Sequence, residues 1–292
     1  PDSKPVNFEV KRGEIVGVTG LDGNGQDDFV KILAGVQEPH GGTTEILGSN
    51  EKFLKYNSLD DAKNNGISFV SGDRKKEGIL PNLSIYENLV VPLYKKTSKA
   101  GFLGFVNWME LNGIFDWEVE RLNIKTGPRD NLIGSLSGGN QQKVMIARSF
   151  AQHPKVLILN DPARGIDVST KRDLYVHLRK YVEEGNTVVF LSSELEEFIG
   201  LCPKVMVFRN GTIFDIFENE KVNADNLLEG MFGQTAGIGE TTISSKSNSP
   251  SSPIPNRPAK NNKFPEKKIV KVVDFDKENT DEDKAKIRIK TF

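Results

Sequence analysis

The sequence predicts an α/β fold built on a doubly wound, mostly parallel β-sheet. Short apolar segments rich in β-branched residues recur along the chain, at residues 14–19, 67–70, 155–159 and 187–191. Segments with helical periodicity separate them, and this alternation is typical of βαβ units. The first of these strands runs directly into a glycine-rich loop followed by a helix, which is the layout of a phosphate-binding P-loop.

Length, charge and cysteine content narrow the class of protein. The 292 residues allow one ordinary domain with appendages, or two small domains. A formal net charge of −1 without a dominant basic run argues against nucleic-acid binding. The single cysteine, Cys202, cannot form an intrachain disulfide, which indicates a reducing compartment. No apolar run could cross a bilayer and no signal peptide is recognisable, so we expect any membrane role to come through a partner.

The glycine-rich loop keeps the glycines of a P-loop and departs from it at two functional positions. Gly20, Gly23 and Gly25 fit the Gly-x-x-x-x-Gly-Lys-Ser/Thr frame. Gln26 stands where the lysine is expected, and Asp27 stands where the Mg²⁺-binding hydroxyl is expected. The negative charge of Asp27 would face the phosphates of a bound nucleotide. One such like-charge contact at about 4 Å costs on the order of 4 kcal/mol before screening. We therefore expect no tight Mg²⁺-dependent ATP binding by this loop; the alternative is a glycine turn without any ligand.

A second glycine-flanked segment points to a phosphate from another direction. Ser137, Gly138 and Gly139 precede an apolar helix, so bare backbone N–H groups and the positive helix end meet at one place. This combination favours a site that binds a phosphate group. The alternative is an ordinary serine N-cap with a glycine turn.

Residues 136–143, Leu-Ser-Gly-Gly-Asn-Gln-Gln-Lys, resemble the signature motif of ABC-type ATPases. The residues of this motif are similar to those in the second nucleotide-binding domain of simple-sugar importers such as the ribose and galactose systems. In that family the signature docks on the γ-phosphate of a nucleotide held by the opposite domain. The resemblance implies ATP and Mg²⁺ as cofactors, and it implies that Ser137, Gly138, Gly139 and Gln141 contact a partner's nucleotide.

The strand at residues 155–159 ends in a segment that resembles Walker B plus the D-loop. Asp167 matches the D-loop aspartate, and Asn160 replaces the aspartate that holds Mg²⁺ through water. Asp161 replaces the glutamate that polarises the attacking water, with a side chain one methylene shorter. A general base must lie within about 2.6–3.2 Å of its proton or one water away, so the shorter side chain reduces the expected activity. Asp161 is the candidate base; the alternative is a carboxylate that buttresses the strand end.

Two further segments resemble loops that meet the γ-phosphate in the family. Residues 71–79 are similar to the Q-loop segment, but Gly72 stands in place of the glutamine, and we expect Asp73 and Arg74 to contact a transmembrane subunit. The alternative is a charged surface turn. Ser193 stands where most ABC ATPases carry the switch histidine, and a hydroxyl can bond a phosphate but cannot carry the positive charge of imidazolium. For Ser192 the alternative is a cap of the next helix.

The remaining segments give the expected order of elements and domains. Residues 1–234 are expected to form one nucleotide-binding domain with an antiparallel edge. A helical subdomain is expected to be inserted at about 80–135. In this subdomain Ser84 caps a helix, and Trp108 and Trp117 serve core or interface packing. Residues 235–267 are rich in Ser, Pro, Asn and Thr and predict a disordered linker, and residues 268–292 a short tail whose two strand-like segments could form a hairpin. Other expected elements are strands at 7–10 and 43–48, helices at 29–34, 58–65, 170–183 and 224–232, a connector at 95–104 and an Asn-Gly hairpin at 205–214.

The positions that depart from the family pattern and the positions that match it belong to two different functions. The chain departs from the family pattern where it would bind or hydrolyse its own nucleotide, and it matches where it would serve a partner. The resemblance therefore implies the second half of a sugar-importer ATPase, cytoplasmic and peripheral on the inner face of the membrane. Its partners would be a consensus ABC nucleotide-binding domain, transmembrane permease subunits and, indirectly, a sugar-binding protein, with no nucleic acid. Alternatives are an autonomous weak ATPase, a non-catalytic interaction or scaffold fragment, and a DNA-repair ABC ATPase.

Overall fold

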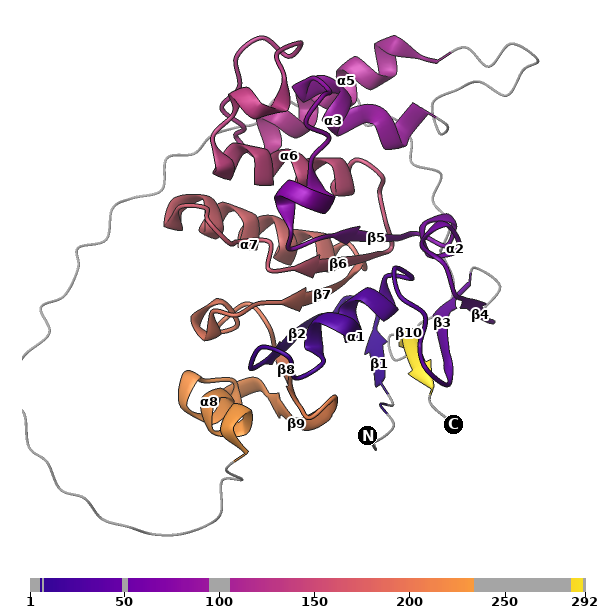
Figure 1. Ribbon diagram of the computed structural model, residues 1–292, viewed down its shortest axis with the longest axis vertical. Helices are drawn as coiled ribbons and strands as arrows, with labels where there is room; N and C mark the ends of the chain where they lie inside the picture. The colour runs from indigo at the N-terminus through magenta and orange to yellow at the C-terminus, as the bar shows by residue number, and fades with distance from the viewer. Residues whose placement is uncertain (1–5, 7, 49–51, 95–105, 234–284, 291–292) are drawn as a thin grey trace, which may run out of the picture. The chain divides into compact units, whose positions relative to one another are not determined.

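The computed structural model describes residues 6, 8–48, 52–94, 106–233 and 285–290. All of them belong to one compact unit, made of Pro1–Ala236 together with Glu282–Phe292 (Figure 1). Within those ranges no helix combines the length and apolar character that a membrane span requires. The expected linker at 235–267, the connector at 95–104 and the tail segment at 268–275 lie outside the described residues.

The centre of this unit is a six-stranded sheet whose strands follow the expected pattern. Its first five strands are parallel and the last is antiparallel to its neighbour, as predicted from the sequence. In spatial order the strands are β5 (Ile67–Val70), β6 (Val156–Asn160), β7 (Thr187–Leu191), β2 (Ile15–Gly20), β8 (Lys204–Arg209) and β9 (Thr212–Glu218).

Both faces of this sheet are covered, and this explains its nearly continuous apolar strands. Successive side chains of a strand point to opposite faces. Ile158 and Val189 therefore pack in one apolar cluster, whereas their neighbours Leu157 and Phe190 pack in another. The first cluster includes helix α1 (Gln26–Leu33). The second includes α6 (Gly138–Phe150), α7 (Val168–Glu183) and α8 (Ala224–Phe232).

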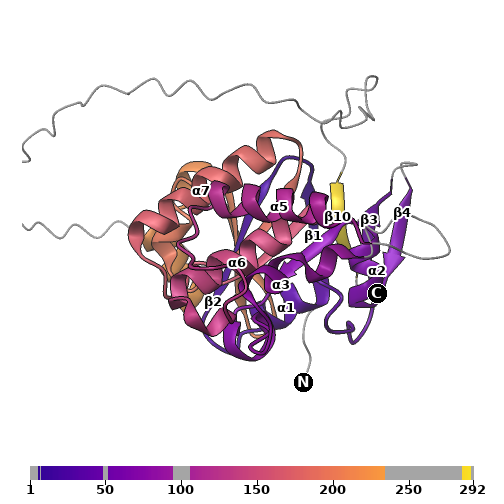
Figure 2. The same cartoon turned by 90° about the horizontal axis from the view of Figure 1, so that it is seen from above.

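A second, four-stranded antiparallel sheet lies on the α1 side. Its order is β1 (Phe8–Lys11), β10 (Ala285–Lys290), β3 (Thr43–Leu47) and β4 (Phe53–Tyr56), and α2 (Leu59–Asn64) follows β4 (Figure 2). The strand expected near the chain's C-terminus is present as β10. Its neighbours are β1 and β3, a pairing that the sequence did not indicate.

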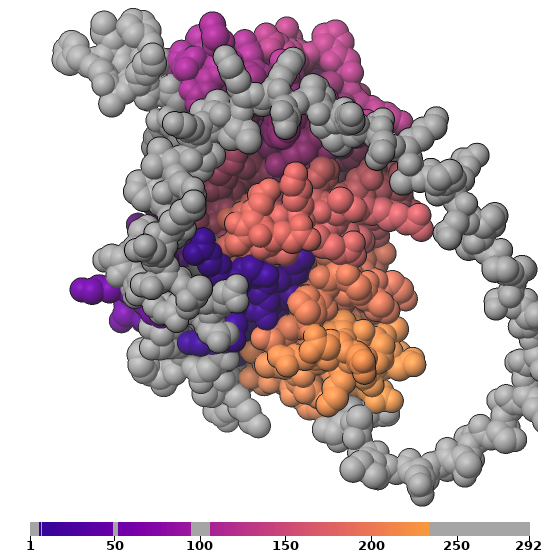
Figure 3. All heavy atoms as spheres, turned by 180° about the vertical axis from the view of Figure 1, so that it is seen from behind, coloured from indigo at the N-terminus to yellow at the C-terminus, as the bar shows by residue number. Residues whose placement is uncertain are grey.

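A helical arm, made of α3 (Ile85–Val90), α5 (Trp108–Arg121) and the 3-10 turns Val91–Leu93 and Ile133–Ser135, lies at one end of the unit. The space-filling view shows this arm in magenta at one end and the β8–β9 and α8 segments in orange at the other (Figure 3). Ser84 and Glu87 form a capping box at α3, as the sequence indicated for Ser84. Trp108 and Trp117 are 56% and 63% exposed, so of the two expected roles core packing is wrong and interface packing stays a prediction.

Two local predictions are confirmed, the start of one helix changes, and one expected loop contains a helical turn. Asn210 and Gly211 adopt positive φ values of 50° and 75° between β8 and β9, as an Asn-Gly hairpin requires. Helix α8 ends at Gly233 with a φ of 77°. Helix α1 begins at Gln26, earlier than the expected residue 29, because Gly25 reaches a φ of 96° as its N-cap. The loop expected at 71–79 contains a π-helical turn, Arg74–Gly78.

Glu118 makes the stability of the helical arm dependent on pH. Its side chain is buried in α5, and burial raises its pKa to about 7, against a smaller opposing effect of Arg121, whose Nε lies 3.4 Å away. Between about pH 4.5 and 7 the folded chain binds more protons than the unfolded chain, so the stability contribution of this residue falls as pH rises.

We expect Glu118→Gln to raise the free energy of unfolding above pH 7, by about 3 kcal/mol as an upper limit, because the buried charge is removed. The gain should disappear below pH 4.5. Urea unfolding at several pH values measures it, with the exposed Glu120→Gln on the same helix as the control. A gain that is the same at all pH values would contradict this account.

Candidate functional site

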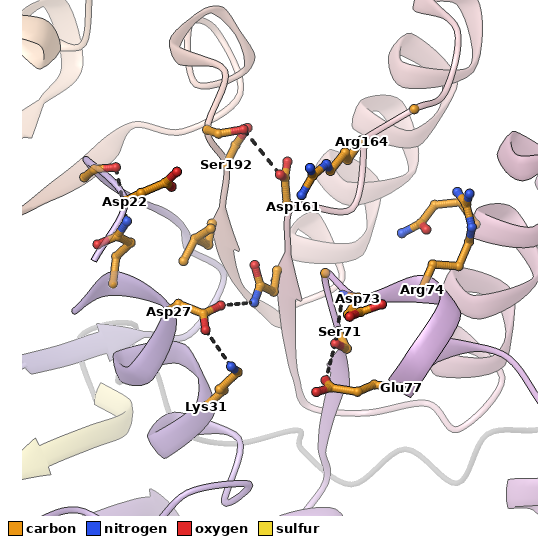
Figure 4. Close-up of a pocket in the computed structure, with 18 of the residues that line it drawn as sticks. Asp22, Asp27, Lys31, Ser71, Asp73, Arg74, Glu77, Asp161, Arg164 and Ser192 are labelled. Carbon is orange, nitrogen blue, oxygen red and sulfur yellow. Dashed lines mark hydrogen bonds and ion pairs between the residues drawn. The ribbon is translucent and has the colours of Figure 1, made fainter. Parts of the chain in front are cut away.

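A cavity of about 760 Å³ lies where the parallel strands β2, β5, β6 and β7 end. This position, at the carboxyl ends of the strands, is the usual ligand site of a doubly wound sheet. Four loops line it (Figure 4). Among its lining residues are eleven that the sequence singled out: Gly20, Gly23, Gln26, Asp27, Gly72, Asp73, Arg74, Asn160, Asp161, Ser192 and Ser193.

The glycine loop is held in a fixed shape by contacts that only glycine permits. A Cβ at Gly20 would lie 2.8 Å from the carbonyl oxygen of Phe208, and Gly25 has a φ of 96°. The hairpin turn also docks on the loop: the N–H of Asn210 donates to Asn24 Oδ1 at 2.9 Å, and the N–H of Gly211 donates to the Asn24 carbonyl at 3.0 Å. The loop is therefore anchored to the antiparallel edge of the sheet.

Gln26 folds back on the loop that precedes it. Its side chain is 7% exposed, and Nε2 donates to the carbonyl oxygens of Gly20 and Leu21 at 3.1 and 3.0 Å. Its Oε1 is buried and has no hydrogen-bond partner in the described part of the chain. The amide group is thus engaged with the loop's own backbone at the position where a P-loop has its lysine.

Asp27 is held by two groups inside the cavity. Its Oδ1 accepts a hydrogen bond of 2.6 Å from Asn160 Nδ2, and its Oδ2 forms an ion pair of 2.6 Å with Lys31 (Figure 4). The hydrogen bond with Asp27 raises the pKa of Lys31. The three side chains satisfy one another, although Asp27 and Asn160 are far apart in sequence.

Asp161 and Ser193 lie together at the ends of two neighbouring strands. Asp161 adopts a positive φ of 46°, and Ser193 Oγ donates to its Oδ2 at 3.3 Å. Burial, followed by the nearby charge of Glu197, raises the pKa of Asp161. Ser192 accepts from the N–H of Glu194 at 3.0 Å just before the 3-10 turn Leu195–Glu197, so its role resembles the expected cap.

The segment after β5 connects the cavity to the signature segment, residues 136–143. Asp73 Oδ1 accepts from the N–H of Lys76 at 3.1 Å and caps the π-helical turn. Arg74 lines the cavity, and its Nη1 donates to the carbonyl oxygen of Gly138 at 3.0 Å. Gly72 leaves room for Asn160, whose Oδ1 would lie 3.1 Å from a Cβ at that position. The contact between Arg74 and Gly138 was not expected from the sequence.

Ser137 is exposed and caps helix α6 outside the cavity. Its Oγ accepts from the backbone N–H and the side-chain Nδ2 of Asn140, at 3.4 and 3.0 Å. Gln141 Nε2 donates to the Leu136 carbonyl at 3.0 Å and holds the preceding turn. The cavity lining includes none of the described residues Ser137, Gly138, Gly139, Gln141 and Asp167.

Asp167 begins helix α7 beside the signature segment. Its carboxylate accepts from the N–H and the hydroxyl of Thr170 at 3.0 and 2.7 Å, and these bonds lower its pKa. A Cβ at Gly139 would lie 3.5 Å from Ile166, which precedes Asp167. The structure therefore brings Ser137, Gly139 and Asp167 to neighbouring helix starts and separates them from Gln26 and Asp27.

The charge of the cavity lining is close to balanced. Asp22, Asp27, Asp73, Glu77 and Asp161 stand against Lys31, Arg74, Lys75 and Arg164. Lys31 and Arg164 were missed by the sequence reasoning; for Lys31, its i,i+4 spacing from Asp27 was the available signal. Within the described ranges no group of three or more His, Cys, Asp or Glu side chains could hold a metal ion.

Comparison with known proteins identifies close relatives of this arrangement. The chain is 38% identical over 223 residues to the ribose import ATP-binding protein of Bacillus cereus strain ZK / E33L, which covers 76% of this chain and 44% of that protein. It is 34% identical over 229 residues to the galactose/methyl galactoside import ATP-binding protein of Mannheimia succiniciproducens, with 78% and 44% covered. The chain thus spans less than half the length of these curated relatives.

Solved structures show the same fold. A dimeric post-hydrolysis state of an ATP-binding cassette bound to ADP and Pi matches with a TM-score of 0.62 and 25% identity, covering 73% of this chain and 88% of that one. A nucleotide-free ATP-binding cassette from an ABC transporter matches with a TM-score of 0.63 at 19% identity, covering 80% and 92%. A family model described as ABC transporter matches residues 3–164, more than half of the chain. Together with the P-loop layout and the signature segment, this match places the chain in the ABC transporter family.

Proposed function

We propose that this chain is the non-consensus nucleotide-binding half of an ABC importer for simple sugars. It lends its signature segment to ATP held by a consensus partner domain and binds Mg²⁺-ATP poorly in its own cavity. The single observation that carries the proposal is a contrast in bonding: Ser137 stands exposed at a helix start, whereas the Asp27 carboxylate on the cavity wall is already bonded to Asn160 and Lys31.

The residues of the chain's own cavity do not fit a magnesium-bound triphosphate. Gln26 uses its amide on the backbone of its own loop, so this position supplies no ammonium to a phosphate. Asp27 occupies the place of a Mg²⁺-binding hydroxyl with a negative charge, and its partner Asn160 replaces a carboxylate with a neutral amide. The lining also contains more carboxylates than cations. Repulsion of a polyanion in this cavity is the physical reason for weak binding.

The signature segment retains what a phosphate needs. Helix α6 runs from Gly138 to Phe150, so its first N–H groups and its dipole concentrate positive potential beside Ser137. Gly138 and Gly139 carry no side chain that would block close approach. The dimeric state of the similar ADP-bound cassette supports a role for this surface at an interface between two domains.

The names of the similar import proteins support the remaining partners. We assign the helical arm and residues 72–78 to contact with transmembrane permease subunits, and a sugar-binding protein acts indirectly through them. The site of action is the cytoplasmic face of the membrane, where the chain is peripheral. We assign no sugar site to the cavity, because its lining is largely charged.

A second candidate, an autonomous weak ATPase, is favoured by Asp161. Its raised pKa and its contact with Ser193 are properties of a general base in a nucleotide pocket. Mg²⁺-ATP hydrolysis by the isolated chain that is lost in Asp161→Ala would establish this function in place of the first.

The leading proposal is tested at Ser137. In a complex assembled with a consensus nucleotide-binding domain, we expect Ser137→Arg to reduce ATPase turnover at least a hundredfold, because a bulky side chain blocks approach of the partner's nucleotide. Steady-state phosphate release measures it. Ser135→Arg places the same bulk on an exposed residue just before the motif and serves as the control. Unchanged turnover in the Ser137 variant would refute the proposal.

Restoration of the chain's own cavity gives an independent test. The triple variant Gln26→Lys, Asp27→Thr and Asn160→Asp returns an ammonium, a hydroxyl and a carboxylate to the family positions. We expect its affinity for Mg²⁺-ATP to rise at least tenfold over the natural chain, as measured by fluorescent nucleotide titration. Asp28→Thr, which removes a neighbouring carboxylate outside the cavity lining, should leave the affinity unchanged. Equal affinities of the triple variant and the natural chain would contradict the account of the cavity.

The contact between Arg74 and Gly138 predicts a connection between the cavity and the signature segment. Arg74→Ala should lower the free energy of unfolding by about 1 kcal/mol, since one charged hydrogen bond is lost while a buried, unpartnered Nε is also removed. Amide exchange at the start of α6 should accelerate in the same variant. The exposed Lys75→Ala is the matched control. Protection of α6 that is equal in both variants would show that the contact has no such role.

A further inference from the structure

Strand β10 lies far from its neighbours in sequence and between them in space. It pairs antiparallel with β1 on one side and with β3 on the other, at four positions each (Figures 1 and 2). Both neighbours belong to the first fifty residues, whereas β10 begins at Ala285. The C-terminal segment therefore fills a strand-wide slot in the N-terminal sheet.

Residue types match along the register of this slot. Arg288 is the register partner of Glu9 in β1 and of Glu45 in β3, so residue types of opposite charge share one position along the ladder. Ile287 is paired with Val10 and with Ile46. Opposite charges and apolar pairs at facing positions favour one register over its neighbours, because a shift by one residue exchanges the two faces of a strand.

Without β10 the sheet would be divided. Adjacent strands lie about 4.7–4.9 Å apart, so β1 and β3 would be separated by roughly 9.5 Å and could not pair with each other. Within the described residues β10 is the strand that pairs with β1. Removal of β10 would expose two rows of backbone N–H and C=O groups, which is a template for another strand.

The slot supports the helix that carries the glycine loop. Phe8 of β1 packs edge-on against Phe29 of α1, with ring centroids 5.2 Å apart. Tyr56 of β4 donates to the Leu33 carbonyl at 2.7 Å. These residues share one buried cluster with Val10 and Ile46. Order in the four-stranded sheet is thus connected to the position of α1.

We propose that the gap between β1 and β3 is a strand-binding site whose ligand is the chain's own segment Ala285–Lys290, bound within the same molecule. Main-chain hydrogen bonds on both edges supply the affinity, and the paired residue types supply the register. The chain between α8 and β10 is long, but the entropy cost of closing a loop grows only slowly with its length. Binding of the strand within the same molecule therefore carries only a modest entropy cost.

Paired cysteines test the register and the origin of the strand. Paired Cα atoms on neighbouring antiparallel strands are close enough for a disulfide. In a Cys202→Ala background of the full chain, Glu9→Cys with Arg288→Cys should form a disulfide in monomers under mild oxidation. Glu9→Cys with Ile287→Cys is one position out of register and should form at least tenfold less. Cross-linked dimers, or equal yields from the two pairs, would overturn the proposal.

A proline variant tests the energetic role. A proline in a strand paired on both sides removes a hydrogen-bond donor and clashes with the ladder. Arg288→Pro should lower the Tm by about 5 °C or more relative to Asn262→Pro, the same substitution in the preceding segment. Equal Tm values would overturn the proposal; if Arg288→Pro fails to fold, the disulfide yields decide. Neither measurement involves nucleotide, so the outcome is independent of the proposed function.

Discussion

The structure depends on the burial of the six-stranded sheet on both of its faces. Parallel strands that are covered on each side must be apolar throughout, and they must all end at the same edge. This constraint collects four polar loops at the carboxyl ends of β2, β5, β6 and β7, although the loops are scattered through the sequence. The cavity is therefore a consequence of the sheet, and its chemistry is decided by the few residues placed just beyond each strand.

Those residues are the basis of the function proposed above. Gln26, Asp27 and Asn160 make their bonds with the loop, with Lys31 and with one another, so their polar groups are already engaged within the chain. Ser137 is outside the cavity lining and stays exposed at the start of α6, whereas Gln142 of the same helix lines the cavity. Arg74 contacts both regions through the cavity lining and the Gly138 carbonyl. Under the proposed function, the acidic side chains of the lining disfavour a polyanion in the cavity, while the start of α6 still offers its N–H groups to a partner.

The sequence predicted the central fold because its signals are local. β-Branched apolar runs, the glycine loop and the Asn-Gly turn each act over a few residues, and the six-stranded sheet follows from their order. Contacts between distant residues carried no such signal. The hydrogen bond from Asn160 to Asp27, the bond from Arg74 to Gly138 and the pairing of β10 with β1 each join segments that no periodicity connects. The presence of the site residues could therefore be predicted, but the way in which Gln26 and Asp27 are occupied could not.

The docking of the β8–β9 turn on Asn24 has a mechanical consequence. Two backbone N–H groups of the turn hold one residue of the glycine loop, and a Cβ on Gly25 would lie 3.0 Å from the Gly211 Cα. Loop and hairpin turn are therefore joined by direct contacts that do not involve the helical arm. A displacement of the turn between β8 and β9 would move the glycine loop with it.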